Sequence, residues 1–244
     1  MKDDLIYGIH PVSEALQAGK DIDKVFVLGG HSSQNLKQLI QDLKSAKVPV
    51  KVVPQEKLNR LTRKNHQGVV AFLSSVEFDR LENVIPFLFE NAQVPLVVLL
   101  DQISDVRNTG AIARTAYGCG AQAIVVPSRG GAALGSDAQK TSAGALSYIS
   151  VCRVEHMIQA VRYLKESGLQ IVACSEKSDR WIKKVDFTLP TAILMGSEDE
   201  GISKELLAEA DHVVSIPIEG KVGSFNVSVA SGMILYEASM QRLK

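Results

Sequence analysis

Three short segments of this 244-residue chain place polar side chains and glycine directly after an apolar run. They span residues 101–116, 192–203 and 216–230. Carboxamide, carboxylate, hydroxyl and guanidinium groups can together orient a nucleophile and assist the removal of its proton. The candidate side chains are Asn108, Arg114, Glu198, Ser224 and Asn226. Because ligands of open α/β sheets bind at the carboxyl ends of strands, these three strand ends predict one shared site.

The segment 216–230 has the composition of a ligand-binding loop that opens the last helix. Gly220 and Gly223 lack the Cβ that would keep a ligand away from the backbone. The first N–H groups of a helix are unpaired, and Ser224 and Asn226 add short polar groups beside them. A helix capped by Ser224 or Asn226 after a flexible loop explains the same residues without a ligand. The two upstream segments tip the interpretation toward a ligand site.

Alternating apolar runs and helical patterns predict an α/β fold with a mostly parallel sheet covered on both faces. Strands are expected at 25–28, 50–53, 69–73, 96–101, 123–127, 149–153, 169–173, 192–196 and 212–218, and helices at 34–45 and 226–242. A less regular, proline-containing stretch suggests an amino-terminal domain at 1–76, a linker at 77–94 and a second domain at 95–244. If a helix begins near Gly110, Asn108 lies at its mouth and Arg114 about one turn in, with small residues leaving room around it.

The net charge is zero, but it is unevenly distributed along the chain. Residues 1–76 hold eleven Lys and Arg against seven Asp and Glu, whereas residues 77–244 hold sixteen against twenty. A basic cluster in the first part, Lys57, Arg60, Arg63 and Lys64, precedes His66 and Gln67 and could contact phosphates. A solvated helix end explains the cluster equally well.

Several classes of protein are disfavoured. No apolar stretch is long enough to span a bilayer, and the acidic start does not fit a secretory signal, so we expect a cytoplasmic protein. The three cysteines and five histidines show no metal-ligand spacing, so no metal is expected. No glycine-rich dinucleotide fingerprint follows the first strands, and the scarce aromatic residues offer no stacking stripe of the kind that single-strand binders use.

The three polar segments resemble the three motifs of the SpoU (TrmH-like) branch of the SPOUT RNA methyltransferases. The matching stretches are 108–116, 196–201 and 216–230, in that order. The resemblance implies methyl transfer from S-adenosylmethionine to a ribose 2′-hydroxyl of RNA. It also implies a catalytic domain with a deep trefoil knot near its carboxyl end, and a homodimer.

The amino-terminal part carries a resemblance of its own. Residues 7–16 and 65–71 are similar to the small L30-like substrate-binding domain of the ribosomal RNA members. They point to members that methylate a guanosine of 23S ribosomal RNA, and the expected RNA-binding residues are His10, Arg60, Arg63, Lys64, His66, Gln67 and Arg114. Three alternatives stay open: a tRNA ribose methyltransferase, a resistance methyltransferase acting on another ribosomal nucleotide, and a non-catalytic RNA-binding or ribosome assembly factor.

The resemblance also implies roles for the candidate residues. Arg114 would be catalytic, and because a guanidinium group is a poor general base we expect it to orient the phosphate and ribose and to lower the pKa of the hydroxyl. Asn108, Glu198, Ser224 and Asn226 would hold Arg114 and the ribose in register, although Glu198 could simply favour a helix N-terminus. The cofactor contacts implied are Gly196, Ile216, Ile218, Ser224 and Phe225. Phe225 replaces the usual leucine, which puts the local shape of the pocket in doubt.

Overall fold

The computed structural model describes residues 5–30 and 33–243, which form two compact units. Unit 1 contains the described residues up to Glu77 together with Ala133–Asp137. Unit 2 contains Phe78–Ala132 and the described residues from Ala138 onward.

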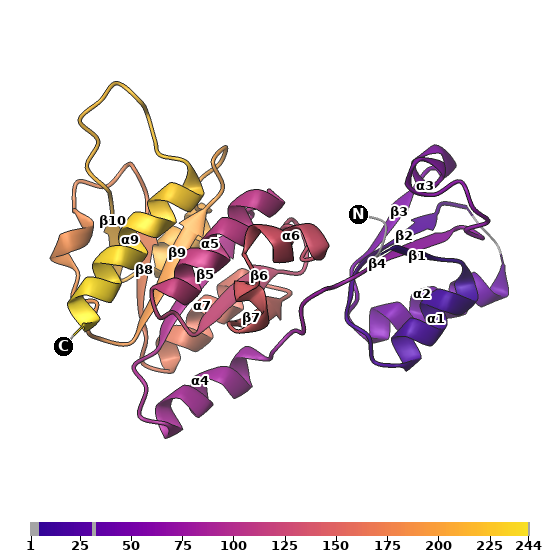
Figure 1. Ribbon diagram of the computed structural model, residues 1–244, viewed down its shortest axis with the longest axis horizontal. Helices are drawn as coiled ribbons and strands as arrows, with labels where there is room; N and C mark the ends of the chain where they lie inside the picture. The colour runs from indigo at the N-terminus through magenta and orange to yellow at the C-terminus, as the bar shows by residue number, and fades with distance from the viewer. Residues whose placement is uncertain (1–4, 31–32, 244) are drawn as a thin grey trace. The chain divides into compact units, whose positions relative to one another are not determined.

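Unit 1 is a four-stranded sheet with helices on both faces (Figure 1). Its elements are β1 (Leu5–Tyr7), α1 (Ile9–Gln17), β2 (Ile22–Leu28), α2 (Gln34–Ser45), β3 (Val50–Val53), α3 (Gln55–Leu61) and β4 (Val69–Leu73). The strand order is β1-β4-β2-β3, with β2 and β3 parallel and the other pairs antiparallel. Helices α1 and α2 bury Val12, Leu36 and Leu43 against one face, whereas α3 buries Leu58 against the other. The apolar alternation of β2 supplies both cores, because successive side chains point to opposite faces.

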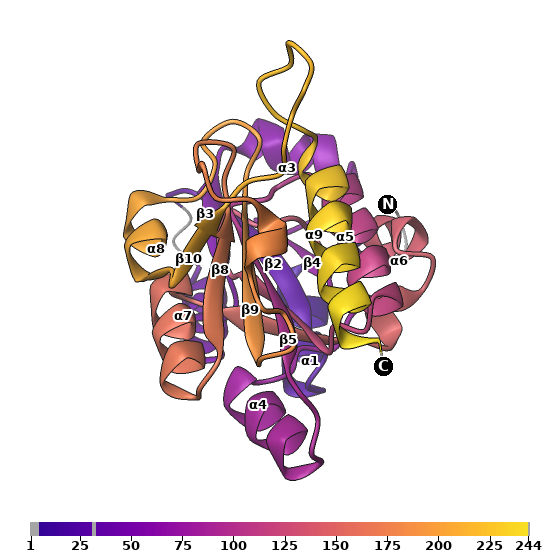
Figure 2. The ribbon, with the colours of Figure 1, turned by 90° about the vertical axis from the view of Figure 1, so that its left-hand side faces the viewer.

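Unit 2 is a six-stranded sheet in which every paired strand is parallel. Its strands are β5 (Leu96–Asp101), β6 (Ala123–Pro127), β7 (Ser150–Val154), β8 (Gln170–Cys174), β9 (Thr191–Gly196) and β10 (His212–Val214), in the order β10-β8-β9-β5-β6-β7. The helical segments are α4 (Leu81–Glu90), α5 (Val106–Gly118), α6 (Ser136–Thr141, whose first two residues are grouped with unit 1), η1 (Ala145–Ser147), α7 (Met157–Glu166), η2 (Ile182–Lys184), α8 (Lys204–Glu209) and α9 (Val227–Arg242). Helices α5 and α9 cover one face, and α4, α7 and α8 cover the other (Figure 2). The predicted α/β class and mostly parallel sheet are confirmed, and the knot stays a prediction.

Helix α4 lies in the stretch 77–94, which the sequence predicts to be an irregular join. Pro86 suggests an interruption because it lacks an N–H donor, yet it lies inside this helix. Leu81, Ile85 and Leu88 are buried in the core of unit 2, so tertiary packing stabilises the helix despite its proline. Across the described residues, no helix is long and apolar enough to cross a membrane.

Helix α5 begins four residues earlier than expected. The carboxylate of Asp105 caps it by accepting hydrogen bonds from the backbone N–H groups of Arg107 (2.7 Å) and Asn108 (2.9 Å). A Cβ placed on Gly110 would lie only 2.6 Å from the Cβ of Thr141. Gly110 therefore allows close packing of α5 against Thr141, and the side chain of Arg114 on the same helix is exposed.

Candidate functional site

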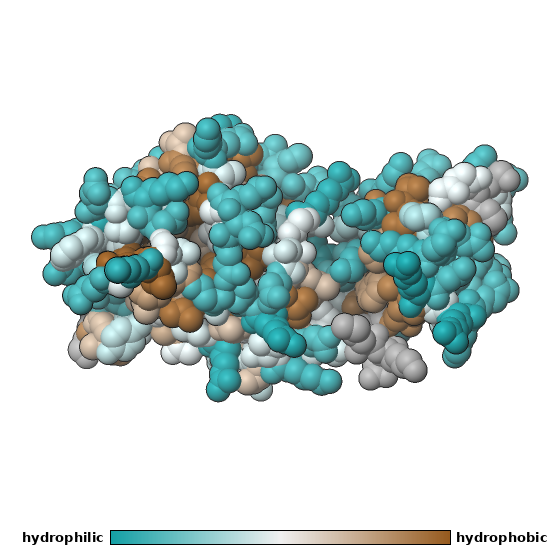
Figure 3. All heavy atoms as spheres, turned by 90° about the horizontal axis from the view of Figure 1, so that it is seen from above, coloured by the Kyte–Doolittle hydropathy of each residue, from teal (hydrophilic) through white to brown (hydrophobic). Residues whose placement is uncertain are grey.

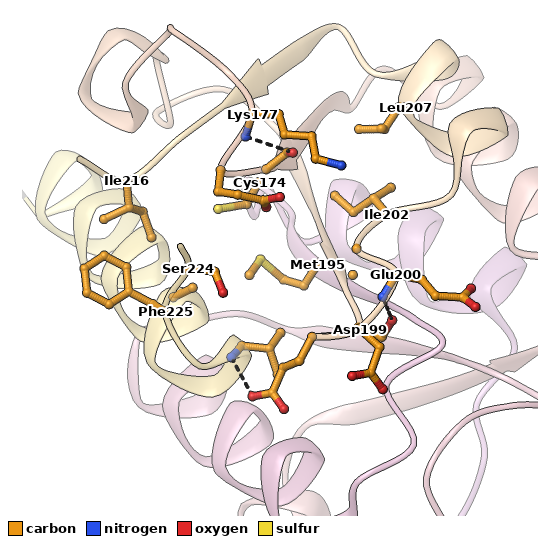
Figure 4. Close-up of a pocket in the computed structure, with 18 of the residues that line it drawn as sticks. Cys174, Lys177, Met195, Asp199, Glu200, Ile202, Leu207, Ile216, Ser224 and Phe225 are labelled. Atoms are coloured by element: carbon orange, nitrogen blue, oxygen red, sulfur yellow. Dashed lines mark hydrogen bonds between the residues drawn. The ribbon is translucent and has the colours of Figure 1, made fainter. Parts of the chain in front are cut away.

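A cavity opens at the carboxyl ends of β8 and β9, where two of the three polar segments meet (Figure 4). Part of its wall is apolar, formed by Met195, Ile202, Leu207, Ile216, Ile218 and Phe225. Another part carries charge, from Glu176, Lys177, Glu198, Asp199 and Glu200. A cavity with an apolar wall and a mixed-charge rim suits a ligand that combines a flat apolar group with a charged one.

Gly196 lines this cavity at a tight turn in which the chain folds back against it. A Cβ at this position would lie 2.1 Å from the carbonyl carbon of Gly201 and 2.3 Å from the nitrogen of Ile202. The turn is held by a hydrogen bond from the N–H of Gly201 to the carbonyl oxygen of Ser197 (2.9 Å). Glycine is thus required at 196 because two backbone segments touch, whether or not a ligand is bound.

The remaining polar segment, residues 101–116, lines a second hollow, and Glu198 borders both this hollow and the cavity. This hollow contains Gln102, Ser104, Asp105 and Asn108, and it shares residues 197–200 and Val227 with the cavity. The end of β5 lies beside the end of β9 because the strands pair in parallel, with Asp101 opposite Gly196. Glu198 therefore lies on the wall between two neighbouring spaces.

Asn226 ties the three segments together. Its Nδ2 donates to Oδ1 of Asn108 at 3.1 Å and also to Oε1 of Glu198. Its Oδ1 caps α9 by accepting from the N–H groups of Ser228 (3.0 Å) and Val229 (3.4 Å). Asn226 can therefore cap the helix and hold the site residues at the same time, because its Oδ1 performs the first task and its Nδ2 the second.

Only part of the loop before α9 reaches the cavity. Ile216, Ile218, Ser224 and Phe225, four of the predicted cofactor contacts, line it. The tip between them extends away from the sheet (Figure 2), and a Cβ built on Gly220 or Gly223 would have no described atom within 4 Å beyond the glycine and its two chain neighbours. The two glycines leave space open, but they do not form the cavity wall.

Arg114 does not join the other candidates in this chain. It lies in the ninth position of α5, more than two turns from the start, and borders neither hollow. Its side chain is exposed, and within residues 5–30 and 33–243 it has no hydrogen bond or ion pair. The early start of the helix explains the difference, because six residues separate Arg114 from Asn108 by about 240° around the helix axis.

In unit 1, the two motif segments of the amino-terminal part meet. Oε1 of Gln67 accepts a hydrogen bond from the N–H of Ile9 (3.0 Å) at the start of α1, beside the exposed His10. His66 is buried, and its Nδ1 accepts from the N–H of Gly68 (3.0 Å) while Nε2 lies 3.0 Å from Oδ1 of Asn59. This placement gives His66 a structural task in the loop.

The basic cluster of unit 1 is open to solvent. Lys57 and Arg60 lie on α3, and Arg63 and Lys64 lie in the loop after it, all with exposed side chains. None of them forms an ion pair with an acid among the described residues. Their charges are therefore available to an anionic partner.

The end of β8 forms part of the cavity wall, which was not predicted from the sequence. Cys174, Ser175 and Lys177 line it there, and the rule that ligands bind at strand ends could have included them. Burial, together with the nearby carboxylate of Glu176, raises the pKa of the Cys174 thiol to about 12. Cys174 is thus a neutral wall group. Within the part of the chain that the structure describes, no cluster of three His, Cys, Asp or Glu side chains could hold a metal ion.

Comparison with known proteins agrees with this geometry. The SpoU rRNA Methylase family profile matches residues 95–236, and a profile described as RNA 2′-O ribose methyltransferase substrate binding matches residues 5–78. A protein of Staphylococcus haemolyticus named as a TrmH family tRNA/rRNA methyltransferase is 32% identical over 242 residues, covering 99% of this chain and 97% of its own length.

Two solved structures are informative because they differ in the extent of the match. An AdoMet-bound rRNA methyltransferase from Sinorhizobium meliloti aligns with a TM-score of 0.62 and 25% identity, covering 98% of this chain and 88% of that one. A TrmH/SpoU tRNA modifying enzyme of A. aeolicus aligns with a TM-score of 0.57 and 32% identity, covering only 66% of this chain and 84% of that one. On the strength of the profile match and the full-length relative, this chain belongs to the SpoU rRNA methylase family.

Proposed function

We propose that this protein transfers a methyl group from S-adenosylmethionine to a ribose 2′-hydroxyl of ribosomal RNA, at a guanosine of 23S RNA. The observation that carries the proposal is the hydrogen-bonded set of Asn108, Glu198 and Asn226 between two adjoining spaces. Two spaces that share one wall suit a reaction between two bound molecules, because the reacting atoms must approach closely.

The cavity fits S-adenosylmethionine. Its apolar wall, with Ile216, Ile218 and Phe225, suits the adenine ring, and the polar Ser224 and the carboxylates at its rim suit the charged amino acid end. When bound, this cofactor supplies a methyl group on a positively charged sulfur. The Glu198 carboxylate, fixed by Asn226 and by the N–H of Val227 (3.3 Å), would favour positive charge on the side of the cavity that faces the second hollow.

The second hollow would receive the ribose. Asn108 and Glu198 offer acceptors there, and both are held by the Nδ2 of Asn226, so their positions are set before the RNA arrives. A ribose hydroxyl is a weak nucleophile, so fixed acceptors around it would contribute mainly by orientation.

We infer that Arg114 completes the site from a second copy of the chain. Arg114 is exposed and lies outside both hollows of its own chain. The nearby surface of α5 and α9 exposes Tyr117, Val229, Tyr236 and Met240, which a homodimer would bury. In such a dimer Arg114 would bind the substrate phosphate and orient the ribose.

Ribosomal RNA is favoured over tRNA by unit 1. The S. meliloti rRNA enzyme spans this unit, whereas the A. aeolicus tRNA enzyme aligns with only 66% of the chain. The exposed Arg60, Arg63 and Lys64 would give this unit its affinity for phosphates. A ribosomal substrate would also make the protein cytoplasmic.

Methyl transfer to defined RNAs tests the substrate. The protein is incubated with labelled S-adenosylmethionine and, separately, with unmodified 23S RNA and bulk tRNA, and the methylated ribose is mapped. Label on a 23S guanosine supports the proposal, and label confined to tRNA replaces the substrate. If the protein binds the cofactor and labels neither these RNAs nor a ribosomal precursor, a non-catalytic RNA-binding role is favoured.

Mixing two inactive variants tests the composite site. Arg114→Ala and Glu198→Gln each remove one charged group. A mixed dimer retains one complete site only if the two residues act across subunits. After unfolding and refolding together, we expect about a quarter of the normal activity to return. No recovery in a mixture shown to contain mixed dimers contradicts the shared site.

A further inference from the structure

The sequence predicts no aromatic stacking stripe, but one face of the unit 1 sheet carries three aromatic rings from three adjacent strands. Tyr7 lies on β1, Phe26 on β2 and Phe72 on β4, and the strand order is β1-β4-β2. Tyr7 and Phe26 both pair with Val70, and Phe72 lies two residues further along the same strand, so all three rings point to one side. This side, which also carries α3, is here termed the aromatic face (Figure 1).

Each of these rings has a lysine ammonium group above it. The pairs are Lys64 over Tyr7 (5.8 Å from nitrogen to ring centre), Lys57 over Phe26 (5.0 Å) and Lys24 over Phe72 (5.5 Å). Phe26 is nearly buried and meets Phe72 edge to face, with ring centres 6.0 Å apart. Tyr7 and Phe72 are only half-buried. Their rings are covered by the long side chains of lysines and not by apolar side chains.

The charge around the aromatic face indicates an anionic partner. Besides the three lysines, Arg60 and Arg63 are exposed nearby on and after α3. Two acids lie near these groups as well: Asp23 lies 3.9 Å from Lys24, and Glu56 lies beside Lys57 on α3. The space-filling view from above shows apolar patches among hydrophilic side chains on unit 1 (Figure 3).

We propose that the aromatic face binds unpaired bases of the RNA, with Tyr7 and Phe72 as stacking platforms and the lysines on the flanking phosphates. The proposal rests on the proposed function for its RNA substrate, and it adds the mode of recognition. A duplex keeps its bases stacked within the helix, so flat rings on a sheet select single-stranded loops.

Replacement of a lysine by an RNA base on these rings is expected to be favourable in free energy. An exposed cation–π contact contributes about fivefold to an equilibrium at most. Stacking of one base on an aromatic side chain contributes about 5- to 100-fold, and the displaced ammonium gains a phosphate as its partner. A neutral protein segment would displace the lysines without providing this second gain.

Binding to a single-stranded probe tests the aromatic face. The full chain, without S-adenosylmethionine, is titrated into fluorescein-labelled oligo(A) and, separately, into a labelled hairpin duplex of equal charge. We expect Tyr7→Leu and Phe72→Leu each to weaken binding of oligo(A) by about 5- to 100-fold and to change duplex binding by less than about twofold. Phe87→Leu on α4 is the matched control, because Phe87 is an exposed phenylalanine of unit 2, and it should change neither affinity.

Several results would overturn the inference. Unchanged oligo(A) affinity in both variants is one, and an altered sedimentation coefficient with unchanged oligo(A) affinity is another, because it would identify the face as a protein contact. Ultraviolet crosslinking of the unaltered protein to oligo(A) is independent of mutant folding, and crosslinks that all lie outside the peptides holding Tyr7 and Phe72 would also contradict the proposal. Failure of the proposed function appears differently, as an absence of methyl transfer by the unaltered protein.

Discussion

Replacement of Asn226 by aspartate separates the two tasks of this side chain. Aspartate caps a helix as well as asparagine does, so the bonds to the N–H groups of Ser228 and Val229 should survive. The amide donor, however, becomes an anionic oxygen that faces Oδ1 of Asn108 and the carboxylate of Glu198. Two attractive contacts then become repulsive ones without a change in side-chain size.

The magnitude follows from the exposure of the pair. Two carboxylates about 4 Å apart repel by about 1 kcal/mol in water and about 4 kcal/mol near a protein surface. Asn226 and Glu198 are both exposed, so the cost should lie near the lower end, at about 1–2 kcal/mol. This is enough to turn Glu198 away from the wall between the two spaces, and a misplacement of about 1 Å at a reacting centre lowers the rate about 100-fold.

The assay compares turnover with folding stability. We expect Asn226→Asp to lower kcat for RNA methylation about 100-fold and to lower Tm by only a few degrees. Asn226→Ser keeps a capping oxygen and adds no charge, so its loss of kcat should be about tenfold. The double variant Asn226→Asp with Glu198→Gln restores a donor–acceptor pair with the roles exchanged, and it should recover Tm. An Asn226→Asp enzyme with kcat within about twofold of normal would refute the reasoning.

Three further predictions concern the core and the cavity. Gly196→Ala should abolish S-adenosylmethionine binding in calorimetry, because its Cβ would lie 2.1 Å from the carbonyl carbon of Gly201. Normal affinity would show that this turn can relax. Arg242→Met should lower the free energy of unfolding in urea by about 2–4 kcal/mol, because the guanidinium donates to four backbone carbonyl oxygens, and an unchanged value would contradict this. Cys174 should react slowly with iodoacetamide up to about pH 9, since burial and Glu176 raise the pKa of its thiol to about 12 and only the thiolate reacts; mass spectrometry showing ordinary thiol rates would exclude this.

The sequence predicts the sheet of unit 2 well because its strands are buried on both faces. Runs such as Leu96–Leu100 and Ala192–Met195 are continuously apolar, and both are fully buried strands in the structure. The last helix is predicted equally well, since Asn226 is a strong N-cap and the chain after it holds no proline. Local signals suffice where burial and capping agree.

Contacts between distant segments are harder to predict. The aromatic face joins residues 7, 26 and 72, and no spacing rule connects them until the strand order is known. The start of α5 also depended on a choice among several capping residues, and Asp105 takes this role where Asn108 was expected near the helix mouth. Because α5 starts at Val106 and not near Gly110, Asn108 and Arg114 both lie in the helix, six residues and about 240° apart around its axis.

The register between β5 and β9 explains why the two hollows share a wall. Asp101 and Gly196 are opposite each other at the ends of these strands, so the turns that follow must run side by side. Asp101 is buried, and its Oδ2 accepts a hydrogen bond from the N–H of Ser203 at 2.9 Å, which fixes the second turn against the first strand. Burial of the Asp101 carboxylate without such a donor would lower the stability of the fold. Loss of the carboxylate or of its hydrogen bond to Ser203 should therefore loosen the turn that carries Glu198. The site is therefore positioned by the core of the sheet, and α9 closes it through Asn226.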